Sequence, residues 1–231
     1  MWIYLYQNNS ELAMKNAYIG EVWTPTSNTL LYMPLNWDAK DEVSGNSGTW
    51  SGTAQYQTLA SWLKVANCNS SSYILTPSIT TNAPITISWW LYRVDGNVIF
   101  RSDSKNWTRN LWQIAINGRP ADTQWAWWWI YYNGTGYLYY SWTNAWWKYI
   151  VVTLWSNWVK IYVNWELTYT YNNTSFVWKT QQWWINFDQY STSLPIPWAW
   201  YYSNLIIENR VWTAEQVALY YNNTKSNYWI S

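Results

Sequence analysis

Residues that commonly carry out chemistry in proteins are scarce in this chain. Its 231 residues include no histidine and one cysteine, Cys68. The lack of histidine excludes Ser–His–Asp triads, Cys–His pairs, histidine metal sites and histidine pH switches. One cysteine cannot form an internal disulfide, and we interpret Cys68 as a partly buried small residue in a loop.

The carboxylates do not form a recognisable catalytic set. The 12 aspartate and glutamate residues are scattered along the chain. Asp41 and Glu42 are adjacent, so on a strand their side chains would point to opposite faces. Four others have the character of ordinary loop charges: Asp103, Asp122, Glu166 and Asp188. We therefore predict that the protein is not an enzyme.

Five tyrosines gather in a segment with the pattern of a β-hairpin, in which the strands Trp127–Tyr132 and Tyr137–Ser141 flank a Gly-containing turn. They are Tyr131, Tyr132, Tyr137, Tyr139 and Tyr140. Alternating residues of a strand share one face, and aromatic rings offer platforms for sugar rings. Tyr131, Tyr137 and Tyr139 are therefore candidate carbohydrate-binding residues. The alternative is that one row of tyrosines lies in the core and the other covers the sheet.

Tryptophan is over-represented and glycine is scarce, with 26 Trp against 8 Gly, where glycine typically makes up about 7% of a chain. Tryptophan follows asparagine at Trp37, Trp107, Trp158 and Trp165. Asn-Gly is the preferred two-residue hairpin turn, because both central residues take positive φ. A residue with a β-carbon costs roughly 1–2 kcal/mol in that region.

Three interpretations of these tryptophans compete: a surface for stacking on sugars, core packing, or residues that are glycine in the natural protein. The turn positions favour the third. Some bacteria and their phages read UGA as glycine, and translation of such a gene under a UGA-tryptophan code would give this pattern. We predict that most of these positions are glycine in the source, so the tryptophan count cannot support sugar binding.

The clearest secondary-structure signal lies between Trp147 and Tyr171. Lys148–Leu154, Val159–Val163 and Leu167–Tyr171 carry β-branched and aromatic residues at a period of two, which is typical of strands. The links between them are short, so we expect three consecutive antiparallel strands. Ile85–Val94 is predicted as another strand, with Asn97–Ser102 as its hairpin partner across Asp95-Gly96.

One short helix is expected near the C-terminus. Thr213, with Gln216 three residues later, fits a capping box, and Val217, Tyr220 and Tyr221 would form the apolar stripe. About a dozen short strands and this helix predict an all-β fold, a two-sheet antiparallel jelly-roll sandwich with one short C-terminal helix.

Four segments resemble, in order, the motifs of laminin-G-like (LamG), concanavalin-A-like jelly-roll domains. They are LYMPLN at 31–36 with DEVSGN at 41–46, ITISWW at 85–90, WKYIVVT…VKIYVNWEL at 147–167, and LIIENRVWTAEQ at 205–216. The resemblance covers 28–223 and implies the sandwich for that range. Residues 1–27 would be an attachment segment, an edge hairpin or a disordered leader, and 224–231 a tail. Trp90 and Trp147 fall where the family itself has tryptophan, whereas Trp212 stays undecided.

The resemblance also implies a calcium site, because related domains often bind this ion with loop oxygens. Asp38, Asp41 and Asn46 lie in the loop that matches the family, and carboxylate and amide oxygens suit calcium. The positions where the family's closing strand usually has Asp-Glu are Ser203 and Asn204 here, which weakens the case. The alternative is that Asp41 holds the turn as an Asx motif.

Charge and length limit the remaining functions. The formal net charge is +1 with 11% charged residues, which leaves no electrostatic footprint for nucleic acid or an anionic membrane. No apolar run reaches the roughly 20 residues of a membrane-spanning helix. The N-terminus lacks the basic region and the apolar length of a signal peptide.

The resemblance leads to a non-enzymatic recognition or adhesion module whose partner is a surface glycan or a particle or cell-surface protein. We expect it outside the cell, on the cell surface or on a virion. The second interpretation is a structural or decoration component of a phage tail or other extracellular appendage. The third is a glycoside hydrolase, since the fold also carries such enzymes, but no carboxylate pair with the required facing arrangement is evident.

Overall fold

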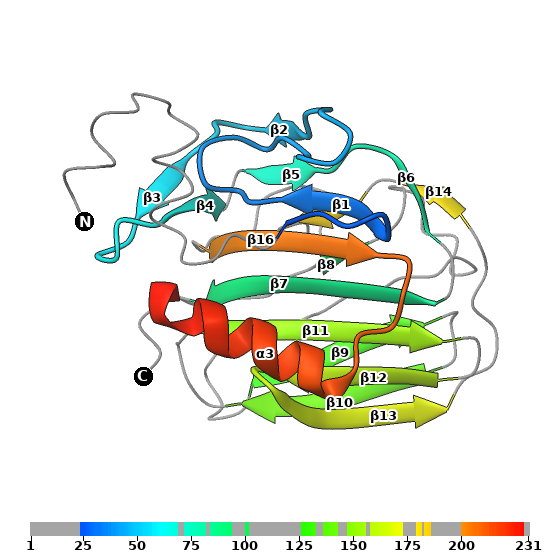
Figure 1. The fold of residues 1–231 in the computed structure, drawn as a ribbon. Coiled ribbons are helices and arrows are strands. Elements are labelled where there is room, and N and C mark those ends of the chain that lie inside the picture. Colours follow the sequence, from blue (N-terminus) through cyan, green and yellow to red (C-terminus); the bar gives the residue numbers. More distant parts are fainter. Residues whose placement is uncertain are drawn as a thin grey trace.

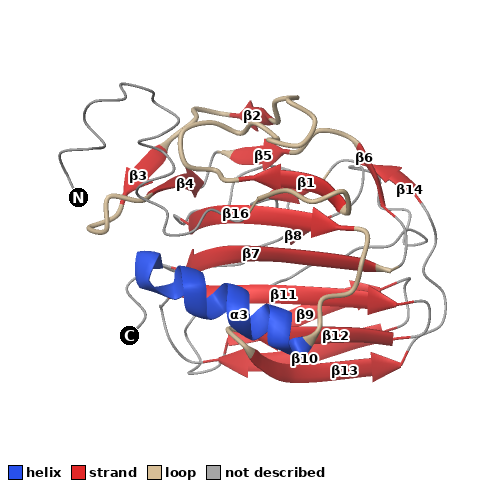
Figure 2. Cartoon of the chain, in the orientation of Figure 1, coloured by secondary structure: helices blue, strands red, loops and turns tan. Residues whose placement is uncertain are grey.

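The structure is a computed structural model that describes residues 24–68, 72–81, 84–93, 100–101, 126–132, 136–142, 147–155, 158–172, 179–181, 183–185 and 200–228. Within these ranges the chain forms antiparallel sheets and a single α-helix (Figures 1 and 2), which confirms the predicted all-β sandwich. Most of the predicted attachment segment and the last three residues lie outside the described residues. No described helix is long and apolar enough to cross a membrane.

One large sheet dominates the molecule. Its strands lie in the spatial order β13 (Glu166–Asn172), β12 (Trp158–Val163), β11 (Trp147–Trp155), β7 (Ile85–Arg93), β16 (Trp200–Glu208), β4 (Lys64–Cys68) and β3 (Tyr56–Thr58). β1 (Thr29–Met33) also pairs with β16, further along the same edge as β4. The three consecutive strands predicted between 147 and 171 are confirmed, because β11 pairs with β12 and β12 with β13.

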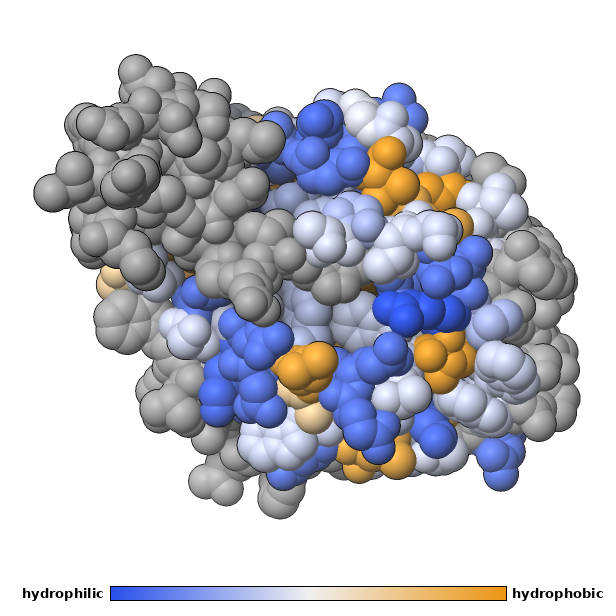
Figure 3. All heavy atoms as spheres, in the orientation of Figure 1, coloured by the Kyte–Doolittle hydropathy of each residue, from blue (hydrophilic) through white to orange (hydrophobic). Residues whose placement is uncertain are grey.

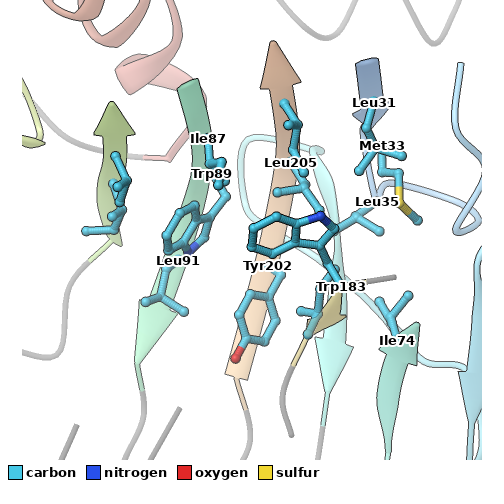
Figure 4. Close-up of a cluster of buried hydrophobic side chains, with 14 of the residues drawn as sticks. Leu31, Met33, Leu35, Ile74, Ile87, Trp89, Leu91, Trp183, Tyr202 and Leu205 are labelled. Carbon is cyan, nitrogen blue, oxygen red and sulfur yellow. The ribbon is translucent and has the colours of Figure 1, made fainter. Parts of the chain in front are cut away.

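Shorter strands form the second layer. A four-stranded sheet has the order β2 (Thr49–Ser51), β5 (Tyr73–Leu75), β15 (Trp184–Ile185) and β8 (Phe100–Arg101). Two further pairs join β6 (Ile79–Thr81) to β14 (Lys179–Gln181) and β9 (Ala126–Tyr132) to β10 (Gly136–Trp142). The main core lies between the layers, where Trp89 and Leu205 of the large sheet meet Ile74 and Trp183 (Figure 4).

The central strands are buried on both faces. In β11, Ile150 and Val152 face the main core, whereas Tyr149 and Val151 belong to a second cluster on the opposite face. This explains why the segment 149–154 is continuously apolar apart from one threonine: each face meets another layer, so neither face has to be polar.

The helix α3 (Ala214–Thr224) covers that second face (Figure 1). The capping box predicted at its start is confirmed, since Thr213 Oγ1 accepts from the Gln216 N–H and Gln216 Oε1 accepts from the Thr213 N–H. Val217, Tyr220 and Tyr221 are buried against the sheet, as the predicted stripe requires. A 3₁₀-helix, Lys225–Tyr228, continues the chain and buries Tyr228.

The hairpin predicted from Asp95-Gly96 is wrong. β7 pairs with β11 on one side and with β16 on the other, so both of its edges are occupied. The segment predicted as its partner contributes β8, which pairs with β15 in the second layer. Asp-Gly favours a tight turn locally, but pairing of the buried strand β7 with β11 and β16 determines its neighbours.

The turn between β12 and β13 differs from the expected Asn-Gly geometry. Asn164 has the positive φ, 60°, and Trp165 is not in the left-handed region. The Asn164 N–H donates to the Tyr149 carbonyl (2.6 Å), and the Tyr149 N–H donates to Asn164 Oδ1 (3.2 Å). The strain expected at Trp165 is therefore absent, because Asn164 takes the left-handed position and fastens the turn to β11.

Candidate functional site

The loop after β1 is held by the fully buried carboxylate of Asp41. Its Oδ1 accepts from the N–H groups of Tyr32 (2.9 Å) and Val43 (3.1 Å). Its Oδ2 accepts from the Ser44 N–H (3.1 Å) and the Ser44 hydroxyl (2.6 Å). The Glu42 N–H also donates to the Tyr32 carbonyl (2.8 Å). The loop thus covers the free edge of β1, which would otherwise present unpaired backbone groups.

These contacts bear on the predicted calcium ligands. Asp38 Oδ1 accepts a hydrogen bond from the Lys40 N–H (3.1 Å), and Asn46 is exposed to solvent. In the part of the chain that the structure describes, no group of three or more His, Cys, Asp or Glu side chains is placed to hold a metal ion. Asp41 does not fit as a ligand here, because each of its oxygens already accepts two hydrogen bonds. Calcium at Asp38, Asp41 and Asn46 stays a prediction, and it would require Asp41 to give up these donors.

A second carboxylate, Glu208 at the end of β16, is also fully buried. Its Oε1 accepts from the hydroxyls of Thr26 (3.3 Å) and Thr29 (3.2 Å). Its Oε2 accepts from Arg210 Nε (2.6 Å) and from the indole N–H of Trp212. Glu208 therefore joins the start of β1, the end of β16 and the segment that leads into α3. Neither buried acid is free for proton transfer.

Glu208 is not among the functional residues predicted from the sequence. The signal that could have revealed it is a lone acid at the end of an apolar strand, followed within four residues by Arg210 and Trp212. Its threonine partners lie about 180 residues away in sequence, so spacing could not have indicated them.

The candidate carbohydrate-binding tyrosines are brought together by the hairpin β9–β10. The register pairs Tyr131 with Tyr137 and Trp129 with Tyr139. Because residues alternate between faces along a strand, Tyr131, Tyr137 and Tyr139 belong to one face of the hairpin. Tyr140, which pairs with Trp128, belongs to the other face. The hairpin lies behind β11–β13 in Figure 1, in the second layer.

The exposed aromatic residues among the described side chains are Trp37, Trp62, Trp155 and Trp165, and lysines contact aromatic rings at two places near them. Lys64 Nζ lies 3.5 Å from the centre of the Trp37 ring, a cation–π contact. At the β11–β12 turn, Trp155 and Trp158 stack with their centres 6.5 Å apart, and Lys160 Nζ lies 4.8 Å from the Trp158 ring. On the face shown in Figure 3, the hydrophobic residues form small separate groups and not one large patch.

Cys68 is fully buried in the main core, not in a loop as the sequence suggested. It is the last residue of β4, next to Trp200 of β16 in the register. Burial raises the pKa of the Cys68 thiol well above its usual range. The thiolate, which is the reactive form, is therefore suppressed.

Comparison with protein-family models and with curated proteins gives no match. Among solved structures, domain 4 of AbnA, a GH43 extracellular arabinanase from Geobacillus stearothermophilus solved with arabinotriose, is similar at a TM-score of 0.63 and 15% identity. The match covers 85% of this chain and 98% of that domain.

Botulinum neurotoxin structures are also similar. The binding domain of serotype D/C matches at a TM-score of 0.60 and 12% identity, over 85% of this chain and 52% of that one. A structure of botulinum neurotoxin type C, whose cell entry depends on interaction with two ganglioside molecules, is similar at a TM-score of 0.58 and 13% identity. This match covers 85% of this chain and 51% of that chain. The chain thus spans about half the length of these toxin structures. At these identities the likeness establishes the β-sandwich fold.

Proposed function

We propose that this chain is a non-enzymatic recognition or adhesion module that binds surface carbohydrate through the face of the β9–β10 hairpin carrying Tyr131, Tyr137 and Tyr139. The observation that carries the proposal is the register, which assigns these three tyrosines to one face. The fold is shared with an arabinanase domain solved with arabinotriose and with botulinum neurotoxin type C, whose cell entry depends on two ganglioside molecules. The hydrogen-bonded state of both buried acids favours binding without catalysis.

The dimensions of such a row suit a short glycan. Residues two apart on a strand are separated by about 7 Å, and directly paired residues by about 5 Å. Each tyrosine combines a flat apolar ring with a hydroxyl that donates and accepts hydrogen bonds. A row of this kind can stack on successive sugar rings and bind their hydroxyls at the same time.

Alanine variants test which face binds. Tyr131→Ala, Tyr137→Ala and Tyr139→Ala are each expected to weaken binding of a glycan ligand about tenfold, which corresponds to about 1.4 kcal/mol. The measurement is calorimetric titration with the glycans that bind on an array, arabino-oligosaccharides and ganglioside headgroups included. Tyr140→Ala is the matched control, since it removes a tyrosine from the other face of the same hairpin. Equal losses for Tyr140→Ala and Tyr137→Ala would contradict the assignment of this face.

We also propose that the domain is LamG-like and acts outside the cell, on a cell surface or on a virion. The four resembling segments support this, because they fall on β1 and its loop, on β7, on β11–β13 and on β16 with the start of α3. The extracellular arabinanase domain of the same fold gives further support. Surface labelling of intact cells or particles with an antibody against the domain tests the location.

A structural component of a phage tail or other extracellular appendage is the second candidate. The specific observation in its favour is that α3 covers one face of the large sheet while the core occupies the other. The central strands of that sheet therefore offer no open face for a ligand. Gene neighbours that encode tail or capsid proteins, together with an array without bound glycans, would favour this candidate.

We further propose that most tryptophans outside the core are glycine in the source organism. Trp62 supports this most directly, because it is 73% exposed and has a φ of 68°, in the region that favours glycine. Trp37, Trp155 and Trp165 are 48%, 45% and 47% exposed. By contrast Trp212, undecided from the sequence, is buried and donates to Glu208, so we assign it as tryptophan.

Reading the gene's codons tests this assignment. We expect UGA at Trp37, Trp62 and Trp165, and UGG at the buried Trp90 and Trp212. UGG at all three exposed positions would end the proposal. The tyrosine-based binding proposal would survive that result, since tyrosine codons are not affected.

A further inference from the structure

Polar groups are buried between α3 and the large sheet, in a region that otherwise consists of aromatic and aliphatic side chains. Asn204 accepts from the Tyr32 hydroxyl (3.5 Å) and donates through Nδ2 to the Tyr228 oxygen (3.0 Å). The Tyr228 hydroxyl donates to Ser203 Oγ (2.9 Å), which in turn donates to the Pro34 carbonyl (3.3 Å). This part of the region is a connected network in which each of these side chains has a partner.

Among the described residues, three hydroxyls beside this network have no hydrogen-bond partner of good geometry: those of Ser88, Tyr149 and Tyr220. The Ser88 and Tyr149 hydroxyls are nevertheless close enough for Ser88 to lower the pKa of Tyr149, against the larger effect of burial, which raises it. Ser88 and Tyr149 are fully buried, and Tyr220 is 7% exposed. Tyr149 lies on β11 and Tyr220 on α3, so the unpaired groups come from both sides of the helix–sheet interface.

The three groups are neighbours. The rings of Tyr149 and Tyr220 stack with their centres 5.0 Å apart. Ser88 pairs with Val151, two residues from Tyr149 on the same face of the sheet. The pKa of Tyr220 is raised first by burial and then by the nearby hydroxyls of Tyr149, Tyr32 and Tyr228, as expected if these groups lie close together.

An unpaired buried hydroxyl is unfavourable by about 1–3 kcal/mol. Most buried polar groups in proteins therefore have a partner, either in the chain or in ordered water. A buried water usually makes two to four hydrogen bonds to otherwise unsatisfied groups. Three adjacent hydroxyls, each able to donate and accept, meet this requirement.

We propose that the interface between α3 and the sheet contains a binding site for an ordered internal water, which is hydrogen-bonded to Tyr149, Tyr220 and Ser88. The water joins a hydroxyl of the helix to two hydroxyls of the sheet. Docking of α3 is therefore partly solvent-mediated and does not rest on aromatic stacking alone.

Removal of single hydroxyls tests the site while the rings are kept. Tyr149→Phe and Tyr220→Phe are each expected to lower the Tm by about 2–4 °C, the shift that corresponds to one water-mediated bond in a chain of this size. The decrease in Tm of the double variant is expected to be smaller than the sum of the two single decreases, because both residues bind the same water. Tyr162→Phe is the neutral control, since the Tyr162 oxygen is not among the buried unpaired atoms.

The same two variants can also contradict the proposal. If the two hydroxyls are truly unpaired, their removal leaves the Tm unchanged or raises it, because the buried unpaired group is lost. That result, or a high-resolution crystal structure in which no water lies within hydrogen-bond distance of both tyrosine oxygens, overturns the proposal. A water in that position together with the lower Tm supports it.

Discussion

At the scale of single residues, the two fully buried carboxylates have structural roles. Asp41 and Glu208 each accept four hydrogen bonds, and each links a segment outside the sheets to a strand. Asp41 holds a loop against the edge of β1. Glu208 connects β1 and β16 to the segment before α3 that carries Arg210 and Trp212. A buried carboxylate is tolerated when its oxygens are hydrogen-bonded or paired with a cation. Glu208 is paired with Arg210, whereas Asp41 is stabilised by hydrogen bonds alone.

Replacement of Glu208 tests this role. Glu208→Ala leaves the buried Trp212 N–H unpaired and removes the ion-pair partner of the partly exposed Arg210, so we expect a loss of about 1–3 kcal/mol in the free energy of unfolding. Urea denaturation measures it. Glu42→Ala is the control, because Glu42 forms an exposed ion pair with Lys40 and such pairs contribute about 0–1 kcal/mol. Similar losses for the two variants would contradict the structural role of Glu208.

At the scale of elements, α3 buries the second face of the central strands. Trp90 stacks on Tyr228 with the ring centres 4.1 Å apart and on Tyr221 at 5.7 Å. The sequence placed 224–231 in a tail, whereas Tyr228 lies in this aromatic cluster. A single tyrosine in a polar segment carries no periodic signal, so its burial could not be predicted from the pattern.

The start of α3 offers a direct test of the capping box. In Thr213→Ala the hydroxyl that accepts from the Gln216 N–H is lost, and we expect a destabilisation of about 1 kcal/mol. Thr213→Ser keeps the acceptor and is expected to retain most of the stability. Thermal denaturation of both variants measures the difference, and equal Tm values for the alanine and serine variants would show that the cap contributes nothing.

How far the sequence predicts the fold depends on the kind of signal. The strands β11, β12 and β13 are predictable because β-branched residues repeat at a period of two and the links are short. The partners of β7 are not, because pairing of a central strand is decided by burial between distant segments. For the candidate site, the hairpin that carries Tyr131 and Tyr137 is predictable, because two neighbouring strand patterns flank a Gly-containing turn. The hydrogen bonds of Asp41 and Glu208 depend on tertiary contacts.

At the scale of the whole molecule, buried tyrosines make stability depend on alkaline pH. Burial raises the pKa of Tyr149, Tyr202, Tyr220 and Tyr228 well above the ordinary value of 10.0. The folded protein therefore holds these protons at a pH where the unfolded chain has lost them. Their contribution is complete below about pH 10 and declines as pH rises further.

Urea denaturation between pH 8 and pH 11 is expected to show constant stability up to about pH 10 and a fall above it. Absorbance of the tyrosinate anion, followed in parallel, should show that the buried group ionises only as the protein unfolds. Ionisation of all tyrosines near pH 10 in a protein that stays folded would contradict the burial described here.

We propose that the domain as a whole binds carbohydrate and leaves it chemically unchanged. The most direct measurement applies the chain to a glycan array and then analyses the bound glycan by mass spectrometry after prolonged incubation. The account predicts that at least one class of surface glycan binds, that Tyr137→Ala weakens this binding, and that the glycan is recovered intact. An array without bound glycans, or recovery of a cleaved glycan, would contradict it.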